Sequence, residues 1–192
     1  MGGQNLQDMS LESLNDRISY VAQEQFLFHM SILENIRLGR PSATDQEVIE
    51  AAKKAQCMEF IDRLPEGIHT SAGDGGKELS GGERQRISLA RAILKDAPVV
   101  VLDEATAFMD PQNEEKMNRA IAEVIRGKTV VVIAHRLYTI TGADQICVLD
   151  QGNLAAVGKH EELLHSCAEY QKLWRAAEGS RNWKVSAGGE KA

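Results

Sequence analysis

Three short runs of apolar residues, rich in Val and Ile, recur along the chain at residues 18–22, 98–103 and 129–134. None shows the strict alternation of apolar and polar positions that marks a strand with one face in water. Segments with the spacing of apolar positions typical of helices separate the runs. The pattern predicts three strands of a buried parallel sheet within an α/β fold.

A fourth apolar run, residues 145–149, leads through the sequence Asp-Gln-Gly-Asn into a fifth, residues 154–157. Two such runs joined by a short turn that contains glycine are typical of a β-hairpin. We expect this hairpin near an edge of the sheet.

A mostly helical insert is expected between the first two strands. Ser31 is followed by Glu34 and Thr44 by Glu47, which is the capping-box spacing of a helix N-terminus. After Thr44, one helical face repeats small and apolar residues, at Val48, Ala52 and Ala55. The insert is therefore expected to pack as a set of amphipathic helices.

Length and composition fit one soluble globular domain. We expect a domain at residues 1–178, with a helical subdomain inserted at about 31–95, and a disordered tail at 179–192. The apolar runs are too short to cross a bilayer, and the first residues lack the pattern of a signal peptide. Scattered cysteines favour a reduced, cytosolic compartment. The net charge of −6 argues against a nucleic-acid partner, because phosphate contact requires a basic face.

Two adjacent carboxylates, Asp103 and Glu104, close the second predicted strand. Successive side chains of a strand point in different directions, and ligands of open parallel sheets bind beyond the carboxyl ends of the strands. One carboxylate can therefore hold Mg²⁺, directly or through water, while the other polarises an attacking water. For an isolated Asp-Glu pair, a cap for the helix that begins near Gln112 is the simpler interpretation.

A second candidate site is the segment Leu-Ser-Gly-Gly-Glu-Arg-Gln-Arg at residues 79–86. Ser80 and Glu83 have capping-box spacing, so an ordinary helix start is the simpler interpretation. Gly81 and Gly82 suit that purpose poorly, because glycine disfavours helix. They do allow an anion to approach free N–H groups at the positive end of the helix dipole. The helix that follows is expected to bury one face, with Ile87, Ala90 and Ile93 or Leu94.

Residues 79–86 resemble the signature motif of the ATP-binding-cassette (ABC) ATPases, and residues 99–106 resemble their Walker B strand. Further matches follow in the order of the family. Gln23 resembles the Q-loop glutamine, Asp110 the D-loop aspartate and His135 the switch histidine. The resemblance implies a P-loop NTPase-type parallel sheet, truncated here, with an inserted helical subdomain.

The resemblance extends over roughly residues 2–173 and is closest to exporter-type transporters in two phrases, residues 31–36 and 73–80. Asp74 departs mildly from the family, in which Glu is commoner at that position. The implied activity is ATP hydrolysis that powers transmembrane transport.

The resemblance also implies roles for the residues beyond the strands. Asp103 would hold Mg²⁺ through its water shell, and Gln23 would complete the surroundings of the ion while sensing the membrane part of the transporter. Glu104 would act as general base for the attacking water. His135 would contact the γ-phosphate of ATP and steady Glu104.

Members of this family bind nucleotide between two domains arranged head to tail. Ser80, Gly81, Gly82 and Glu83 would therefore close over ATP held by a second ABC domain, and Asp110 would cross that interface. The implied cofactors are ATP and Mg²⁺. The implied partners are the second ABC domain and a transmembrane domain, which would hold the chain at the cytoplasmic face of the membrane.

One motif of the family has no match in the sequence. The phosphate-binding loop, Gly-x-x-x-x-Gly-Lys-Ser/Thr, is absent from the 192 residues. Gly127-Lys128-Thr129 imitates its end, but Ala122 occupies the required first glycine position and the segment leads into a predicted strand.

Two explanations of the missing loop stay open. The chain is either a fragment or mis-started reading frame of an active exporter ATPase, which we favour, or a short subunit that lends its signature motif without binding ATP itself. As to function, a chromosome-maintenance or DNA-repair ABC ATPase is a further alternative to the exporter. It is disfavoured because residues 31–64 form a compact helical insert without sustained heptads.

Overall fold

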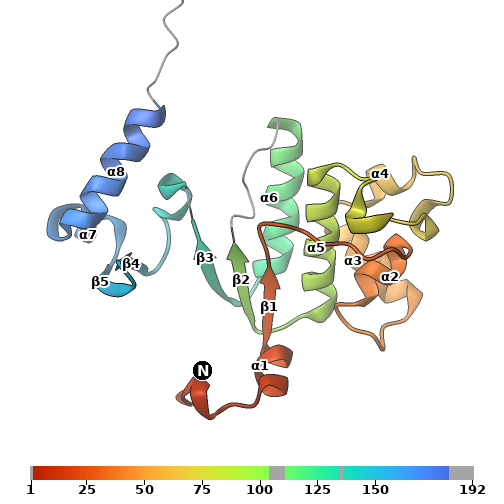
Figure 1. The fold of residues 1–192 in the computed structure, drawn as a ribbon, viewed down its shortest axis with the longest axis horizontal. Coiled ribbons are helices and arrows are strands. Elements are labelled where there is room, and N and C mark those ends of the chain that lie inside the picture. The colour runs from red at the N-terminus through yellow and green to blue at the C-terminus, as the bar shows by residue number, and fades with distance from the viewer. Residues whose placement is uncertain (1, 104–110, 135, 182–192) are drawn as a thin grey trace, which may run out of the picture. The chain divides into compact units, whose positions relative to one another are not determined.

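The computed structural model describes residues 2–103, 111–134 and 136–181 of the chain. It divides into two compact units, Met1–Ile133 and Ala134–Ala192, which are described separately. The first unit is built on a parallel sheet whose strands lie in the order β1 (Ile18–Val21), β2 (Val99–Asp103) and β3 (Thr129–Ile133) (Figure 1). All three predicted strands and their parallel direction are confirmed.

The helices of the first unit lie beside the sheet and beyond it, as Figure 1 shows: α5 and α6 lie next to each other beside the strands, and α2, α3 and α4 lie on the far side of α5. The helices described are α1 (Leu11–Arg17), α2 (Ile32–Arg37), α3 (Asp45–Lys54), α4 (Met58–Ile61), α5 (Gly81–Lys95) and α6 (Pro111–Ile125). Three 3₁₀ turns accompany them: η1 (Leu6–Asp8), η2 (Gly67–His69) and η3 (Asp74–Gly76). The helical insert between β1 and β2 is therefore present.

The predicted helix starts are formed by side-chain caps. Thr44 and Glu47 exchange both hydrogen bonds of a capping box at the start of α3. At the start of α2, Ser31 accepts the N–H of Glu34, but the Glu34 carboxylate pairs with Arg37 one turn further on. The local sequence thus determined where both helices begin.

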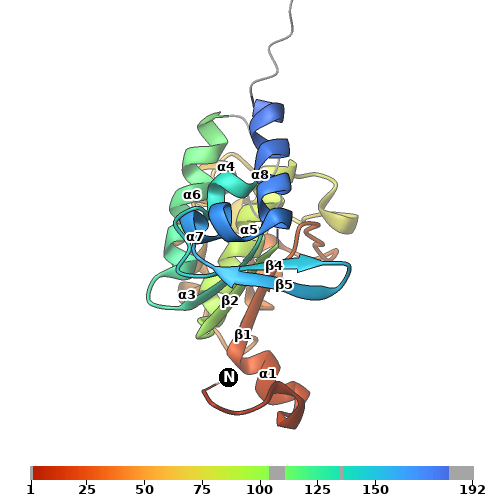
Figure 2. The same cartoon turned by 90° about the vertical axis from the view of Figure 1, so that its left-hand side faces the viewer.

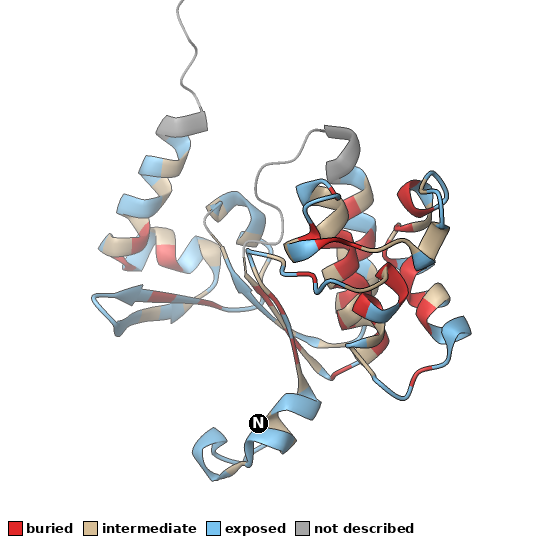
Figure 3. Ribbon diagram, turned by 45° about the vertical axis from the view of Figure 1, so that its right-hand side comes forward, coloured by how far each residue is buried: buried red, intermediate tan, exposed pale blue. Residues whose placement is uncertain are grey.

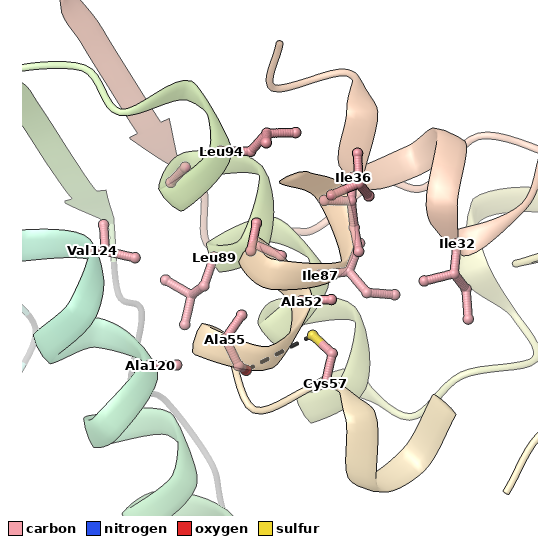
Figure 4. Close-up of a cluster of buried hydrophobic side chains, with 14 of the residues drawn as sticks. Ile32, Ile36, Ala52, Ala55, Cys57, Ile87, Leu89, Leu94, Ala120 and Val124 are labelled. Carbon is pink, nitrogen blue, oxygen red and sulfur yellow. Dashed lines mark hydrogen bonds between the residues drawn. The ribbon is translucent and has the colours of Figure 1, made fainter. Parts of the chain in front are cut away.

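Helix α5 is the centre of the core, because it is buried on two sides (Figure 4). Ile87 points towards Ile36 of α2 and Ala52 of α3, while Leu89 points towards Val124 of α6. The predicted apolar faces are confirmed, with these positions buried: Val48, Ala52, Ala55, Ile87, Ala90 and Leu94. The start of α5 is consequently held by packing along most of the helix.

The prediction of a sheet buried on both faces is wrong. Val100 and Leu102 point to the helix-covered face and are at most 5% exposed. On the opposite face, Tyr20, Val131 and Ile133 are 45–56% exposed. Figure 3 shows the buried positions concentrated in the helices around α5. The strands are four or five residues long and mostly apolar on both faces, so their sequence does not reveal that helices of this unit cover only one face.

The second unit contains the predicted hairpin, which forms its own antiparallel sheet of β4 (Ile146–Asp150) and β5 (Asn153–Gly158). Gln151 and Gly152 make the tight turn, both with positive φ. Figure 2 shows α7 (His160–Ser166) and α8 (Ala168–Arg181) on one side of the hairpin, and η4 (Leu137–Ile140) completes the unit. Its small core includes Leu163 and Tyr170.

Two further predictions concern the boundary of the C-terminal tail and the presence of a membrane-spanning segment. Helix α8 extends to Arg181, past the predicted boundary at residue 178, and residues 182–192 of the predicted tail lie outside the described residues. Within the described ranges, no helix is long and apolar enough to cross a bilayer.

Candidate functional site

The carboxyl edge of the sheet carries two of the predicted site residues. Because β1 and β2 run parallel, their carboxyl ends meet at one edge. Asp103 is the last residue of β2 and is partly buried, and Gln23 follows the end of β1 and is exposed. The backbone carbonyl of Gln23 accepts a hydrogen bond of 2.8 Å from Nε2 of Gln25. The fold therefore puts Gln23 and Asp103 at the same edge, as expected of ligands in this class of sheet.

A residue that the sequence did not single out, Tyr20, contacts Asp103. Its phenol Oη donates a hydrogen bond of 2.6 Å to Oδ2 of the Asp103 carboxylate. The register puts Tyr20 opposite Val101, two residues before Asp103 and on the same face of the sheet. The hydrogen bond to the carboxylate, followed by desolvation and the negative charge of Asp103, raises the pKa of Tyr20 above its ordinary value.

The donor set at this edge fits one kind of metal site. The described residues contain no cluster of three or more His, Cys, Asp or Glu that could enclose a metal ion. Mg²⁺ is commonly held by only one or two carboxylates, and takes its other ligands from water and substrate phosphates. Asp103, with Gln23 at the same edge of the sheet, fits Mg²⁺ held in that way.

The second candidate site is the N-terminus of α5. Ser80 and Glu83 form a complete capping box, in which Ser80 Oγ accepts the N–H of Glu83 at 3.3 Å and Glu83 Oε2 accepts the N–H of Ser80 at 2.8 Å. Only three residues separate the end of α5 from the start of β2, so helix and strand run in opposite directions. The start of α5 therefore lies towards the same end of the unit as the carboxyl edge of the sheet.

The glycines in the first turn of α5 have no local reason to be glycine. Among the residues that the structure describes, a Cβ added at Gly82 would meet no atom within 4 Å, and one added at Gly81 would meet only the Arg84 guanidinium, at 3.9 Å. Neither glycine has a positive φ. Their N–H groups have no acceptor within the helix, because the first turn of any helix lacks one, and they lie at its positive end. The surface is bare backbone, open to the close approach of an anion.

The segment after Gln23 is anchored to the helices by Asn35, which is fully buried. Its amide Nδ2 donates to the carbonyls of Phe28, Met30 and Ser31 at 3.0–3.2 Å. Its Oδ1 accepts the N–H of Phe28 at 2.9 Å and a guanidinium N–H of Arg91 at 2.7 Å. The loop that follows β1 is thus tied through one amide to α2 and α5.

Arg91 extends this network from α5. Its guanidinium also donates to the carbonyls of Phe26, at 2.9 Å, and Asn35, at 2.7 Å. Burial lowers the pKa of Arg91 to about 10, so the side chain is still charged at neutral pH. Neither Asn35 nor Arg91 was singled out from the sequence, because their pairing joins positions 56 residues apart.

The remaining predicted site residues, and the segment that imitates the phosphate-binding loop, lie elsewhere in the chain. Glu104, Asp110 and His135 lie outside the described residues, so their roles stay predictions. The segment Gly127-Lys128-Thr129 leads into β3 as expected, and Lys128 Nζ forms an ion pair of 2.9 Å with Asp96. That arrangement agrees with its exclusion as a phosphate-binding loop.

Comparison with known proteins relates the whole arrangement to membrane transporters. The chain is 48% identical over 181 residues to the mycobactin import ATP-binding/permease protein IrtA of Mycobacterium tuberculosis, covering 94% of this chain and 21% of that protein. It is 44% identical over 172 residues to the ATP-dependent lipid A-core flippase of Desulfotalea psychrophila, covering 90% of this chain and 30% of the flippase. The chain thus spans less than a third of the length of either relative.

A solved structure and a family model agree with these relatives. The structure of a bacterial Atm1-family ABC exporter with ATP bound superimposes with a TM-score of 0.84 at 38% identity, covering 96% of this chain and 32% of the exporter chain. This likeness confirms the expected P-loop NTPase-type fold. The family model described as ABC transporter matches residues 1–107, which include both candidate sites up to Asp103. The chain belongs to the ABC transporter family.

Proposed function

We propose that this chain is part of the ATP-hydrolysing domain of an exporter-type ABC transporter, whose hydrolysis of ATP powers transport across a membrane. Family membership and relatives named as ATP-binding/permease proteins and flippases support the proposal. The domain would extend over residues 1–178, with its helical subdomain at about 31–95. The relatives include an importer and a β-glucan exporter, so this domain would supply energy without setting the direction or the substrate.

The single observation that carries the proposal is the bare backbone at Gly81 and Gly82. The described surroundings leave room for Ala at either position, and Ala would favour the helix by up to about 1 kcal/mol. Within the residues that the structure describes, no contact accounts for glycine at these two positions. A phosphate group of ATP on a second ABC domain would account for glycine here, because it needs close approach to N–H groups at a positive helix end.

The carboxyl edge of the sheet would serve a different nucleotide from the one that the signature residues cover. Asp103 and Gln23 would hold a hydrated Mg²⁺, which when bound neutralises charge that develops on the phosphates. Glu104 would take the proton of the attacking water, and His135 would steady Glu104 and the γ-phosphate. Asp110 would cross to the partner domain.

The partners in this proposal are a second ABC domain, arranged head to tail, and a transmembrane domain. Helix α5 links the two contacts within this chain. Its start presents Ser80 to Glu83 to the partner domain, and its middle holds the loop after Gln23 through Arg91. The chain would act at the cytoplasmic face of the membrane, and no nucleic acid would take part.

Two experiments test the proposal. In the transporter that carries this sequence, Glu104→Gln should lower the turnover of ATP by roughly 10²- to 10⁴-fold, as removal of a general base does. Gly82→Ala should also lower turnover while leaving the midpoint of thermal unfolding unchanged or raised. Near-normal hydrolysis in both variants would contradict the proposal.

The 192-residue chain by itself should bind ATP weakly, since its sequence contains no phosphate-binding loop. Isothermal titration calorimetry with Mg²⁺ and ATP measures this affinity. Micromolar affinity would show that residues outside the family pattern hold the nucleotide.

A further inference from the structure

The contact between Tyr20 and Asp103 is the feature that the family resemblance does not explain. It joins β1 to the last residue of β2 by a hydrogen bond of 2.6 Å, a short distance typical of a hydroxyl that donates to an ionised carboxylate. Tyr20 is 56% exposed, so its ring does not fill the core described above. The hydroxyl, rather than the ring, distinguishes this position.

The hydrogen bond has a geometric consequence for Asp103. It engages Oδ2 and favours the rotamer of Asp103 that keeps this contact. The carboxylate keeps Oδ1 for a second partner while Oδ2 accepts the phenol. It remains suited to contact through one oxygen, including contact with a water of a hydrated Mg²⁺, which gives up its waters reluctantly.

We propose that Tyr20 is a positioning residue that holds the Asp103 carboxylate in one rotamer and presents Oδ1 to a hydrated Mg²⁺ at the carboxyl edge of the sheet. The inference rests on the proposed function for the role of Asp103 in metal binding. Partners that hydrogen-bond to a metal ligand orient it in this way, and their loss typically lowers metal affinity by 10- to 100-fold. Since this site is partly exposed, we expect roughly tenfold for Tyr20→Phe, the low end of that range.

The chain offers a matched control for removal of a tyrosine hydroxyl. Tyr138 is also about half exposed, and its Oη accepts a hydrogen bond of 3.2 Å from Arg136. It belongs to the second unit and not to the sheet of Asp103. Tyr20→Phe and Tyr138→Phe therefore remove the same atom from surfaces of similar exposure.

The first measurement uses the isotopically labelled 192-residue chain without nucleotide. Three-bond couplings of the Asp103 β-protons and the chemical shift of its carboxyl carbon report its rotamer and hydrogen bonding. We expect one dominant χ1 rotamer in the wild type and in Tyr138→Phe, and averaged couplings with a shifted carboxyl resonance in Tyr20→Phe. Equal couplings and shifts in the wild type and in folded Tyr20→Phe would overturn the proposal.

The second measurement titrates Mg²⁺ alone and follows the same carboxyl resonance, which is assigned by its absence from the spectrum of Asp103→Asn. We expect a weaker response in Tyr20→Phe than in the wild type, and equal affinity in these two chains would overturn the proposal. A wild-type chain with no response at Asp103 would instead contradict the metal role assigned under the proposed function. The rotamer comparison would still decide whether Tyr20 positions the carboxylate, so the two failures are distinguishable.

Discussion

Replacing Asn35 by Ala should destabilise the first unit strongly, because one buried amide satisfies several backbone groups at once. The change removes the donor shared by the carbonyls of Phe28, Met30 and Ser31. It also leaves the N–H of Phe28 and one guanidinium N–H of Arg91 without their acceptor. Every one of these groups belongs to the loop after β1 or to the helices that hold it.

The size of the effect follows from the number and kind of bonds. A neutral hydrogen bond contributes about 1 kcal/mol net and one to a charged group about 1.5–3 kcal/mol, and water that enters the space left by the amide restores part of the loss. We therefore expect the free energy of unfolding to fall by about 4 kcal/mol. A domain is typically stable by about 5–15 kcal/mol in total, so the loss is a large fraction.

The assay has to report on the first unit. Both tryptophans, Trp174 and Trp183, belong to the second unit, so tryptophan fluorescence is unsuitable. Urea unfolding followed by far-ultraviolet circular dichroism gives the total change, and hydrogen exchange over residues 26–37 locates it. Asn15→Ala is the control, because Asn15 is exposed and, in the structure described, its side chain accepts a single hydrogen bond, from Lys95. It should change stability by less than about 0.5 kcal/mol.

A double-mutant cycle with Arg91→Met isolates the contact between the two side chains. Residues in one hydrogen-bond network show coupling of about 0.5–3 kcal/mol, and we expect a value in that range. A loss below about 1 kcal/mol for Asn35→Ala, or strictly additive single variants, would refute the reasoning that this amide anchors the loop to α5.

Three further outcomes are expected. Ser19 is buried, and its hydroxyl has no hydrogen-bond partner in the structure described. Ser19→Ala should therefore raise the free energy of unfolding, measured in urea, by about 1 kcal/mol. A clear loss of stability would show that the hydroxyl has a partner. A Cβ at Gly39 would lie 2.3 Å from a backbone oxygen of α5, so Gly39→Ala should lower the free energy of unfolding by about 2 kcal/mol. Gly82→Ala is the control and should not lower it in the same assay. Burial raises the pKa of Cys57 to about 12, so at pH 8 a thiol reagent should label exposed Cys147 and reach Cys57 only after unfolding. Rapid labelling of a chain with both Cys147→Ser and Cys167→Ser, in which Cys57 is the remaining thiol, would contradict its burial.

The same buried thiol should make the free energy of unfolding fall at alkaline pH. The pKa of Cys57 is raised in the folded chain, so the proton is held more tightly there than after unfolding. Its contribution to stability is present below the ordinary thiol pKa of 9 and is lost as pH rises towards about 12. Cys57→Ala should therefore weaken the fall of stability between pH 9 and 12, measured by urea unfolding at each pH.

The local sequence determined most of what is local in this protein. Capping residues such as Thr44 and Ser80 fixed where helices begin, because their side chains bond N–H groups only three residues away. Short apolar runs fixed the strands, and the order of motifs around Ser80 and Asp103 identified the family. These features depend on neighbours along the chain, so they could be predicted without coordinates.

Only the tertiary structure decided which distant side chains meet. Tyr20 reaches Asp103 because the register of two parallel strands joins positions 83 residues apart, and Asn35 meets Arg91 because α2 packs against α5. The exposure of one face of the sheet was likewise invisible in strands that carry apolar residues on both faces. Register and packing arise from the burial of whole faces, and the sequence of a single segment does not specify the partner that it will be buried against.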